Sequence, residues 1–151
     1  MPNTPTPKEE LEQLLTFARD GADRGSPVST NLILKAAREL AIHRQLLLPE
    51  QILSSIETTA YTRSVDHQLA FARDYASRKN VCEMYTLLDR ARGEATKAGI
   101  ELPEQGKIKQ LGEQYTAKPS EENHALLLST LDDYIKTYSN SQKENTPRQH
   151  L

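Results

Sequence analysis

The chain has 151 residues and a net charge of −2 at neutral pH, with 19 basic and 21 acidic side chains. This near balance argues against a basic, polyanion-binding protein, and the single cysteine excludes an intramolecular disulfide. No apolar run approaches the roughly 18 residues of a membrane span, and the first residues are polar and proline-rich rather than a signal peptide, so the sequence predicts a soluble, cytoplasmic protein that does not enter a membrane.

An internal repeat of 54 residues organises the sequence. When residues 11–64 are aligned with residues 65–118 without a gap, 17 of the 54 positions are identical. The identical blocks include Phe-Ala-Arg-Asp, which begins at Phe17 and Phe71, and Leu-Pro-Glu-Gln, which begins at Leu48 and Leu102. Because chance gives only a few identities over such a length, the sequence predicts two copies of one helical unit.

Helix signals in the first copy are strong. Thr6 is a typical N-cap, Pro7 occupies the first helical position, and Glu9 completes a capping box. Gly25 lies where a helix commonly ends, and Pro49 is typical of a further helix start. The signals predict three helices, over residues 7–24, 27–44 and 49–61.

The second copy repeats these signals, and a partial third copy follows it. Asn80 and Glu83 form another capping box, and Gly99 marks another helix end. Gly106 and Gly112 each cost up to about 1 kcal/mol relative to alanine inside a helix, so we expect the helix that contains them to be weak. The signals predict four more helices, over residues 65–78, 81–98, 103–115 and 120–138.

The predicted fold is therefore all-α, with seven antiparallel helices from a duplicated three-helix unit plus a terminal capping helix. Such units stack into a short α-solenoid or a compact bundle. One repeat domain is expected over 6–138, with copy one at 11–64, copy two at 65–118 and a partial third copy at 119–138. Residues 1–5 and 139–151 are polar and nearly free of large apolar groups, so we predict a mobile N-terminus and a disordered tail.

Small and apolar residues shared by the two copies indicate which helix faces are buried. They recur at three- and four-residue steps, which is the period of one helix face. We expect six of them to lie in the core, namely Leu34, Ala37, Ala41, Leu88, Ala91 and Ala95.

The sequence contains no recognisable catalytic, cofactor or metal motif. The glycines are dispersed, so no phosphate-binding loop is formed, and the histidines are scattered rather than spaced as zinc ligands. His124, four residues after Ser120, is interpreted as part of a solvated pair. Cys82 corresponds to Val28 of the first copy, which favours a buried filler over a reactive thiol.

Four arginines shared by the two copies are the candidate binding residues, namely Arg19, Arg38, Arg73 and Arg92. One interpretation is structural, because arginine stems cover apolar helix surface and their head groups pair with neighbouring helices. The other is that equivalent arginines line one groove and bind an acidic partner.

The architecture and the lack of catalytic motifs together favour a non-enzymatic helical-repeat module, or adaptor, that binds a protein or peptide. A nucleic-acid-binding protein with an arginine-lined face is the first alternative, although the balanced charge argues against it. An enzyme whose site is assembled between helices is the second. No cofactor is expected, and the sequence leaves the oligomeric state open.

Overall fold

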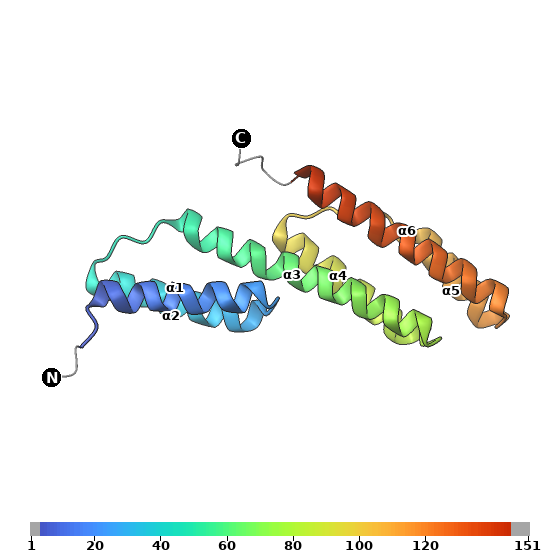
Figure 1. The fold of residues 1–151 in the computed structure, drawn as a ribbon, viewed down its shortest axis with the longest axis horizontal. Coiled ribbons are helices and arrows are strands. Elements are labelled where there is room, and N and C mark those ends of the chain that lie inside the picture. Colours follow the sequence, from blue (N-terminus) through green and yellow to red (C-terminus); the bar gives the residue numbers. More distant parts are fainter. Residues whose placement is uncertain (1–3, 146–151) are drawn as a thin grey trace. The chain divides into compact units, whose positions relative to one another are not determined.

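The computed structural model describes residues 4–145, and the elements within this range are all helices (Figure 1). Six helices occur in the described residues, with no strand among them. In chain order they are α1 (Pro7–Asp23), α2 (Pro27–Arg44), α3 (Glu50–Ser77), α4 (Val81–Ala98), α5 (Gly106–Ala117) and α6 (Glu121–Asn145). The predicted all-α class is confirmed, and the predicted number of seven helices is wrong.

Helices α1 and α2 follow the signals that predicted them. The hydroxyl of Thr6 accepts a hydrogen bond of 3.1 Å from the backbone N–H of Glu9, so Thr6 is the N-cap of α1. Gly25 adopts φ +70° after α1, a left-handed conformation that favours glycine. Helix α2 ends at Arg44, and its C-cap residue Gln45 adopts φ +56° even though it is not a glycine.

The miscount arises at α3, which joins the predicted helices over 49–61 and 65–78 into one helix of 28 residues. The intervening sequence, Thr62-Arg63-Ser64, contains no proline or glycine that would end a helix. Ser64 and Val65 are both buried, so the helix continues through packed residues rather than through a surface turn. The break was inferred from the repeat alone. Pro7 starts the helix that leads into the first copy, but the position 54 residues later is Tyr61, so the second copy has no start signal of its own.

Two further boundaries differ from the prediction. Helix α5 begins at Gly106 rather than Pro103, and residues 101–105 precede it as an irregular segment. Helix α6 continues to Asn145, so residues 139–145 of the predicted disordered tail are helical. The rest of that tail, 146–151, and residues 1–3 of the predicted mobile N-terminus lie outside the described residues.

The described chain forms two compact units. The first contains residues up to His67 together with Gly93–Ile100, and the second contains Gln68–Arg92 and the residues from Glu101 onward. The boundary in α3 therefore falls close to the repeat boundary, whereas a short stretch of the second copy belongs to the first unit. In the first unit α1 and α2 form a helical hairpin, and α5 and α6 form another in the second (Figure 1).

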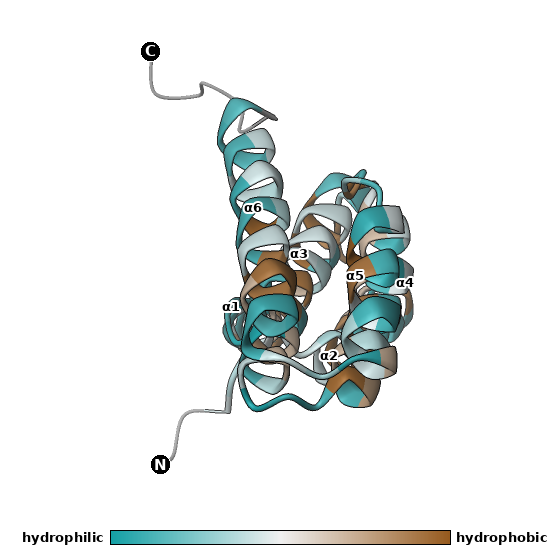
Figure 2. Cartoon of the chain, turned by 90° about the vertical axis from the view of Figure 1, so that its right-hand side faces the viewer, coloured by the Kyte–Doolittle hydropathy of each residue, from teal (hydrophilic) through white to brown (hydrophobic). Residues whose placement is uncertain are grey.

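Buried positions recur at the 54-residue spacing. Eight of the nine buried residues along α1 and α2 show this recurrence, all except Gly21, and they are Leu11, Leu15, Ala18, Ala22, Thr30, Leu34, Ala37 and Ala41. Their counterparts 54 residues later are Val65, Leu69, Ala72, Ala76, Met84, Leu88, Ala91 and Ala95, and all eight are buried too. The predicted burial of the six shared core residues is confirmed. Hydrophobic residues, in brown, are interspersed with hydrophilic ones, in teal, along the helices (Figure 2).

The spacing changes by one residue in the third helix of each copy. Leu53 and Ile56 pack into the first unit, and the corresponding apolar residues of α5, Ile108 and Leu111, lie 55 residues later. Superposition of residues 11–64 on 65–118 stays a prediction.

Candidate functional site

The two arginines of the repeated Phe-Ala-Arg-Asp block have different environments. Arg73 on α3 donates two hydrogen bonds to the carboxylate of Asp132 on α6, of 2.5 Å from Nε and 3.2 Å from the terminal nitrogen. The hydrogen bond to Asp132 raises the pKa of the Arg73 guanidinium, desolvation lowers it by a smaller amount, and coulombic attraction to Asp132 raises it by a still smaller amount. Arg19, its counterpart in the first unit, is exposed and forms no ion pair with the described residues.

The other repeated pair, Arg38 and Arg92, reaches the segment that starts the following helix. Arg38 donates to Glu50, the first residue of α3, at 3.0 Å. Arg92 donates to Gln105, the N-cap residue of α5, at 2.7 Å, and also to Asp89 at 3.1 Å. Both arginines therefore tie the second helix of their copy to the start of the third, which supports the structural interpretation.

In the second unit this contact extends to α6. The side-chain amide of Gln105 donates a hydrogen bond of 3.0 Å to the hydroxyl of Tyr134, while its oxygen accepts from Arg92. Burial raises the pKa of the Tyr134 hydroxyl, and the bond from Gln105 and the charge of Arg92 lower it by smaller amounts. The Arg92–Gln105–Tyr134 chain thus connects α4 and α6 through the segment before α5.

A second set of shared residues lies on the surface instead of between helices. Phe17 and Phe71 are the two phenylalanines of the chain, they are 54 residues apart, and they are 49% and 56% exposed. Asp20 and Arg24 follow Phe17 at three and seven residues, which places them on the same face of the helix or at its end. The same residues recur in the second copy, and we call each set an FDR strip: Phe17, Asp20 and Arg24, and Phe71, Asp74 and Arg78.

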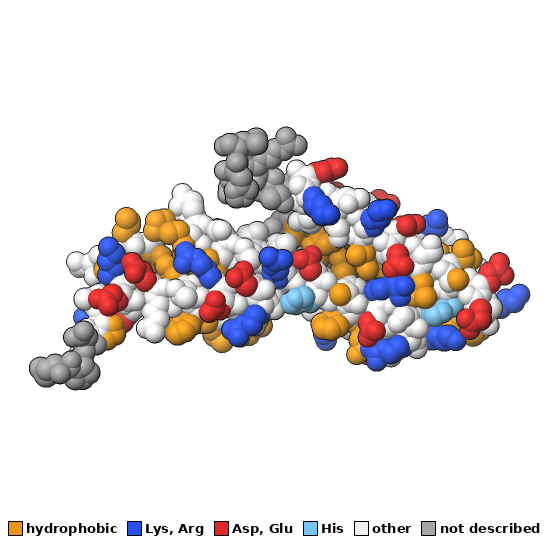
Figure 3. All heavy atoms as spheres, viewed as in Figure 1, with side chains coloured by type: hydrophobic (Ala, Val, Ile, Leu, Met, Phe, Trp, Pro, Cys, Tyr) orange, Lys and Arg blue, Asp and Glu red, His pale blue; other side chains and the backbone are white. Residues whose placement is uncertain are grey.

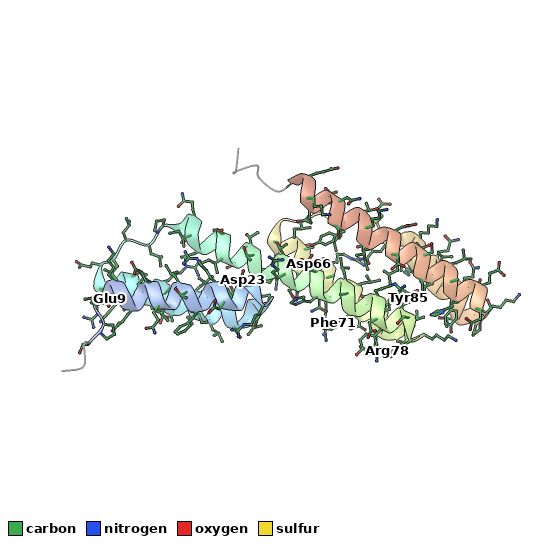
Figure 4. All side chains as sticks on the ribbon, in the orientation of Figure 1. Glu9, Asp23, Asp66, Phe71, Arg78 and Tyr85 are labelled. Atoms are coloured by element: carbon green, nitrogen blue, oxygen red, sulfur yellow. The ribbon has the colours of Figure 1, made fainter. Side chains whose placement is uncertain are left out.

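All six residues of the two FDR strips are exposed. In the second unit the Arg78 guanidinium donates to Asp74 at 2.6 Å and lies 4.5 Å from the ring centre of Tyr75. Phe71 and Arg78 occupy the same edge of α3, on the side away from α6 (Figure 4). The strip therefore presents an aromatic ring beside an ordered ion pair.

Only the arginines of the repeated block were predicted from the sequence as binding residues, and its phenylalanines were missed. A signal was available, because Phe17 lies outside the inward-facing series of Leu11, Leu15 and Ala18 at helical spacing. A large aromatic residue shared by both copies at an outward position is not explained by packing within the unit.

His124 is not the solvated residue that was predicted. It is buried, its Nε2 atom lies 2.8 Å from the carbonyl oxygen of Ala76, and its ring contacts Tyr115 with 5.6 Å between centres. Ala76 is in the last turn of α3, and its carbonyl oxygen also accepts a hydrogen bond of 3.0 Å from the backbone N–H of Lys79. His124 on α6 therefore caps α3, which is a structural role.

Cys82 also differs from the prediction, because it is exposed rather than a buried filler. Its counterpart Val28 is likewise exposed, so this position faces outward in both copies. Among residues 4–145, no cluster of three or more histidine, cysteine, aspartate or glutamate side chains could hold a metal ion. None of the helices described is both long and apolar enough to cross a membrane.

Comparison with known proteins adds no family to this description. No family model, curated protein or solved structure matches the chain.

Proposed function

We propose that the chain is a non-enzymatic interaction module in which a duplicated helical unit presents two FDR strips to a protein or peptide partner. The observation that supports this most directly is the recurrence of Phe17 and Phe71. Single exposed apolar residues are common on any protein surface and carry little information. Here the only two phenylalanines occupy the same position of the repeat, and both are exposed.

The environment of each ring indicates the kind of partner. Aromatic side chains are enriched at the centres of protein interfaces, where they contribute a large contact area at a small cost in conformational entropy. Asp74 and Arg78 lie beside Phe71 and carry opposite charges, so the strip suits a segment with an apolar side chain between polar or charged groups.

The charge distribution favours a protein partner over a nucleic acid. Lysine and arginine side chains are interspersed with aspartate and glutamate over the part of each unit's surface that Figure 3 displays. Nucleic-acid binding depends on neutralising many phosphates with a basic surface. Three of the four arginines predicted as docking residues also support this choice, since Arg38, Arg73 and Arg92 already contact side chains of their own unit.

The test is a comparison of the full chain with the variant F17A/F71A as baits in affinity enrichment, followed by binding measurements with each purified partner. Leu126→Ala is the matched control, because Leu126 on α6 is 45% exposed and is not part of an FDR strip. We expect the dissociation constant to rise about tenfold or more for F17A/F71A, as for the loss of hot-spot residues. L126A should bind as the original chain does.

Two outcomes would overturn the proposal. One is a purified partner that binds F17A/F71A as tightly as the unaltered chain. The other is that the full chain captures no protein whose binding can be reproduced with purified components. Circular dichroism of both variants should match the unaltered chain, because all three side chains are substantially exposed.

A further inference from the structure

Helix α2 carries a second apolar face that points away from the core of its unit. Val28, Leu32 and Ile42 are 74%, 66% and 79% exposed. At 100° per residue they fall within an arc of about 80°, and Lys35 and Glu39 lie in the middle of that arc. These five residues form what we call the outer face of α2.

The buried residues of α2 lie on the opposite side of the helix. They are Thr30, Leu34, Ala37 and Ala41. Helix α2 is therefore apolar on two sides, only one of which is covered. Three large aliphatic side chains, each more than half exposed, therefore share one helix face with the exposed charged residues Lys35 and Glu39.

The equivalent helix of the second copy shows that packing does not require this face. Helix α4 buries the four positions that correspond to those of α2, namely Met84, Leu88, Ala91 and Ala95. Its outward residues are nevertheless polar or small, and those that correspond to the outer face of α2 are Cys82, Thr86, Asp89, Gly93 and Thr96. The apolar residues of the outer face thus distinguish α2 from α4, and this face is separate from the shared FDR strips.

We infer that the outer face of α2 binds the same face of a second copy of this chain, in an antiparallel helix pair. In this pair a two-fold axis passes at the level of Ala37. It places each residue of one helix level with the residue of the other helix for which the two residue numbers add up to 74, which is twice 37. Lys35 of each copy is then level with Glu39 of the other, and Leu32 is level with Ile42. The face is self-complementary in charge and in apolar character, as a two-fold symmetric interface requires.

The charges also argue for this arrangement over others. A parallel pair in register would place Lys35 beside Lys35 and Glu39 beside Glu39, which like-charge repulsion disfavours. Within the described residues neither Lys35 nor Glu39 takes part in an ion pair, so both remain available to a second copy. An 18-residue helix is about 27 Å long, and an α2 pair therefore gives an interface at the small end of the usual range and a concentration-dependent dimer.

The test is sedimentation velocity of the full chain over a range of concentrations, with charge variants that exploit the symmetry. The unaltered chain should shift from monomer to dimer as the concentration rises. Lys35→Glu places two acidic residues opposite each other, and Glu39→Lys places two basic ones, so each single variant should weaken the dimer about tenfold or more. An equimolar mixture of K35E and E39K should dimerise, because each copy then complements the other, and K35E/E39K should dimerise with itself.

The corresponding residues of α4 provide a matched replacement for the apolar residues of the outer face. L32T/I42T gives α2 the outward residues that α4 carries at these positions and should abolish the dimer. T86S/T96S, which keeps the outward positions of α4 polar, should leave the dimer unchanged. Circular dichroism should show equal helix content in all variants, since none of these side chains is buried.

A chain that remains monomeric at every concentration would overturn the inference, and the outer face would then belong to a different protein or to none. A dimer that persists in both single charge variants, or a mixture that fails to form the heterodimer, would equally overturn it. The Phe17 and Phe71 variants distinguish this inference from the proposed function, because they should leave the dimer intact.

Discussion

The hydroxyl of Tyr85 on α4 lies directly against Gly112 on α5 and donates a hydrogen bond of 3.0 Å to the carbonyl oxygen of Lys109. A Cβ atom at Gly112 would overlap this hydroxyl. The glycine was expected to weaken its helix, and it instead permits the close approach of α4 and α5.

Gly112→Ala should therefore destabilise the protein, although alanine is the better helix former. The expected loss is about 1–3 kcal/mol in the free energy of unfolding, because Tyr85 must move and its hydrogen bond is broken. Gly93→Ala on α4 is the control, since nothing lies within 4 Å of a Cβ there, and it should stabilise by up to about 1 kcal/mol. Urea denaturation of the two variants measures the difference, and equal effects at both positions would contradict the steric explanation.

Alanines at the shared core positions should resist enlargement. Ala37 and Ala91 are completely buried, so Ala37→Leu or Ala91→Leu should cost about 1–3 kcal/mol through overpacking. Ala125→Leu on the exposed side of α6 should change stability by less than about 0.5 kcal/mol. Harmless substitutions at Ala37 and Ala91 in denaturant melts would refute the packing assignment.

The local parts of the fold could be predicted from the sequence, and the long-range parts could not. Helix α2 was predicted to the residue, because Pro27 and the core spacing are signals carried by the helix itself. The continuity of α3 was missed because the repeat suggested a boundary where Thr62-Arg63-Ser64 contains no helix-ending residue. The late start of α5 depends on Arg92 and Tyr134, which bind Gln105 from other helices and leave no trace in its local sequence.

The residues of the candidate site were also predictable only where the signal is local in the sequence. The 54-residue spacing identified every residue of the FDR strips as shared between copies, yet spacing cannot separate a residue shared for packing from one shared for binding. Arg73 and Phe71 are two residues apart, and only the position of Asp132 on α6, 59 residues from Arg73, shows that the arginine is engaged within its unit. The capping contact of His124 with Ala76 was unpredictable for the same reason.

Charge reversal at Arg38 and Arg92 separates a structural role from a docking role. R38E/R92E places an acidic side chain beside Glu50 and another beside Asp89, and both sites are exposed, so we expect a lower melting temperature from a loss of about 0.2–1 kcal/mol at each. Adding Glu50→Arg should restore the contribution at the first site. Partner binding should remain as in the unaltered chain, unlike in F17A/F71A. A loss of binding at unchanged thermal stability would restore these arginines as docking residues.

The stability of the protein should fall at alkaline pH, and Tyr134 should carry part of that fall. Burial raises the pKa of Tyr134 above its usual value near 10, so the unfolded chain releases this proton at a lower pH than the folded chain. The contribution is fully present below the unfolded pKa and is lost as the pH rises through the folded pKa. Tyr134→Phe removes this pH-dependent contribution to the free energy of unfolding. It also removes the hydroxyl that accepts a hydrogen bond from Gln105, and this loss costs about 1 kcal/mol at neutral pH.

Urea midpoints measured between about pH 8 and pH 11 should therefore decline less steeply for Y134F than for the unaltered chain. A residual decline is expected, because burial and the charge of Glu113 raise the pKa of Tyr85 as well. If the midpoints of Y134F declined as steeply as those of the unaltered chain, Tyr134 would not be a group that couples ionisation to unfolding.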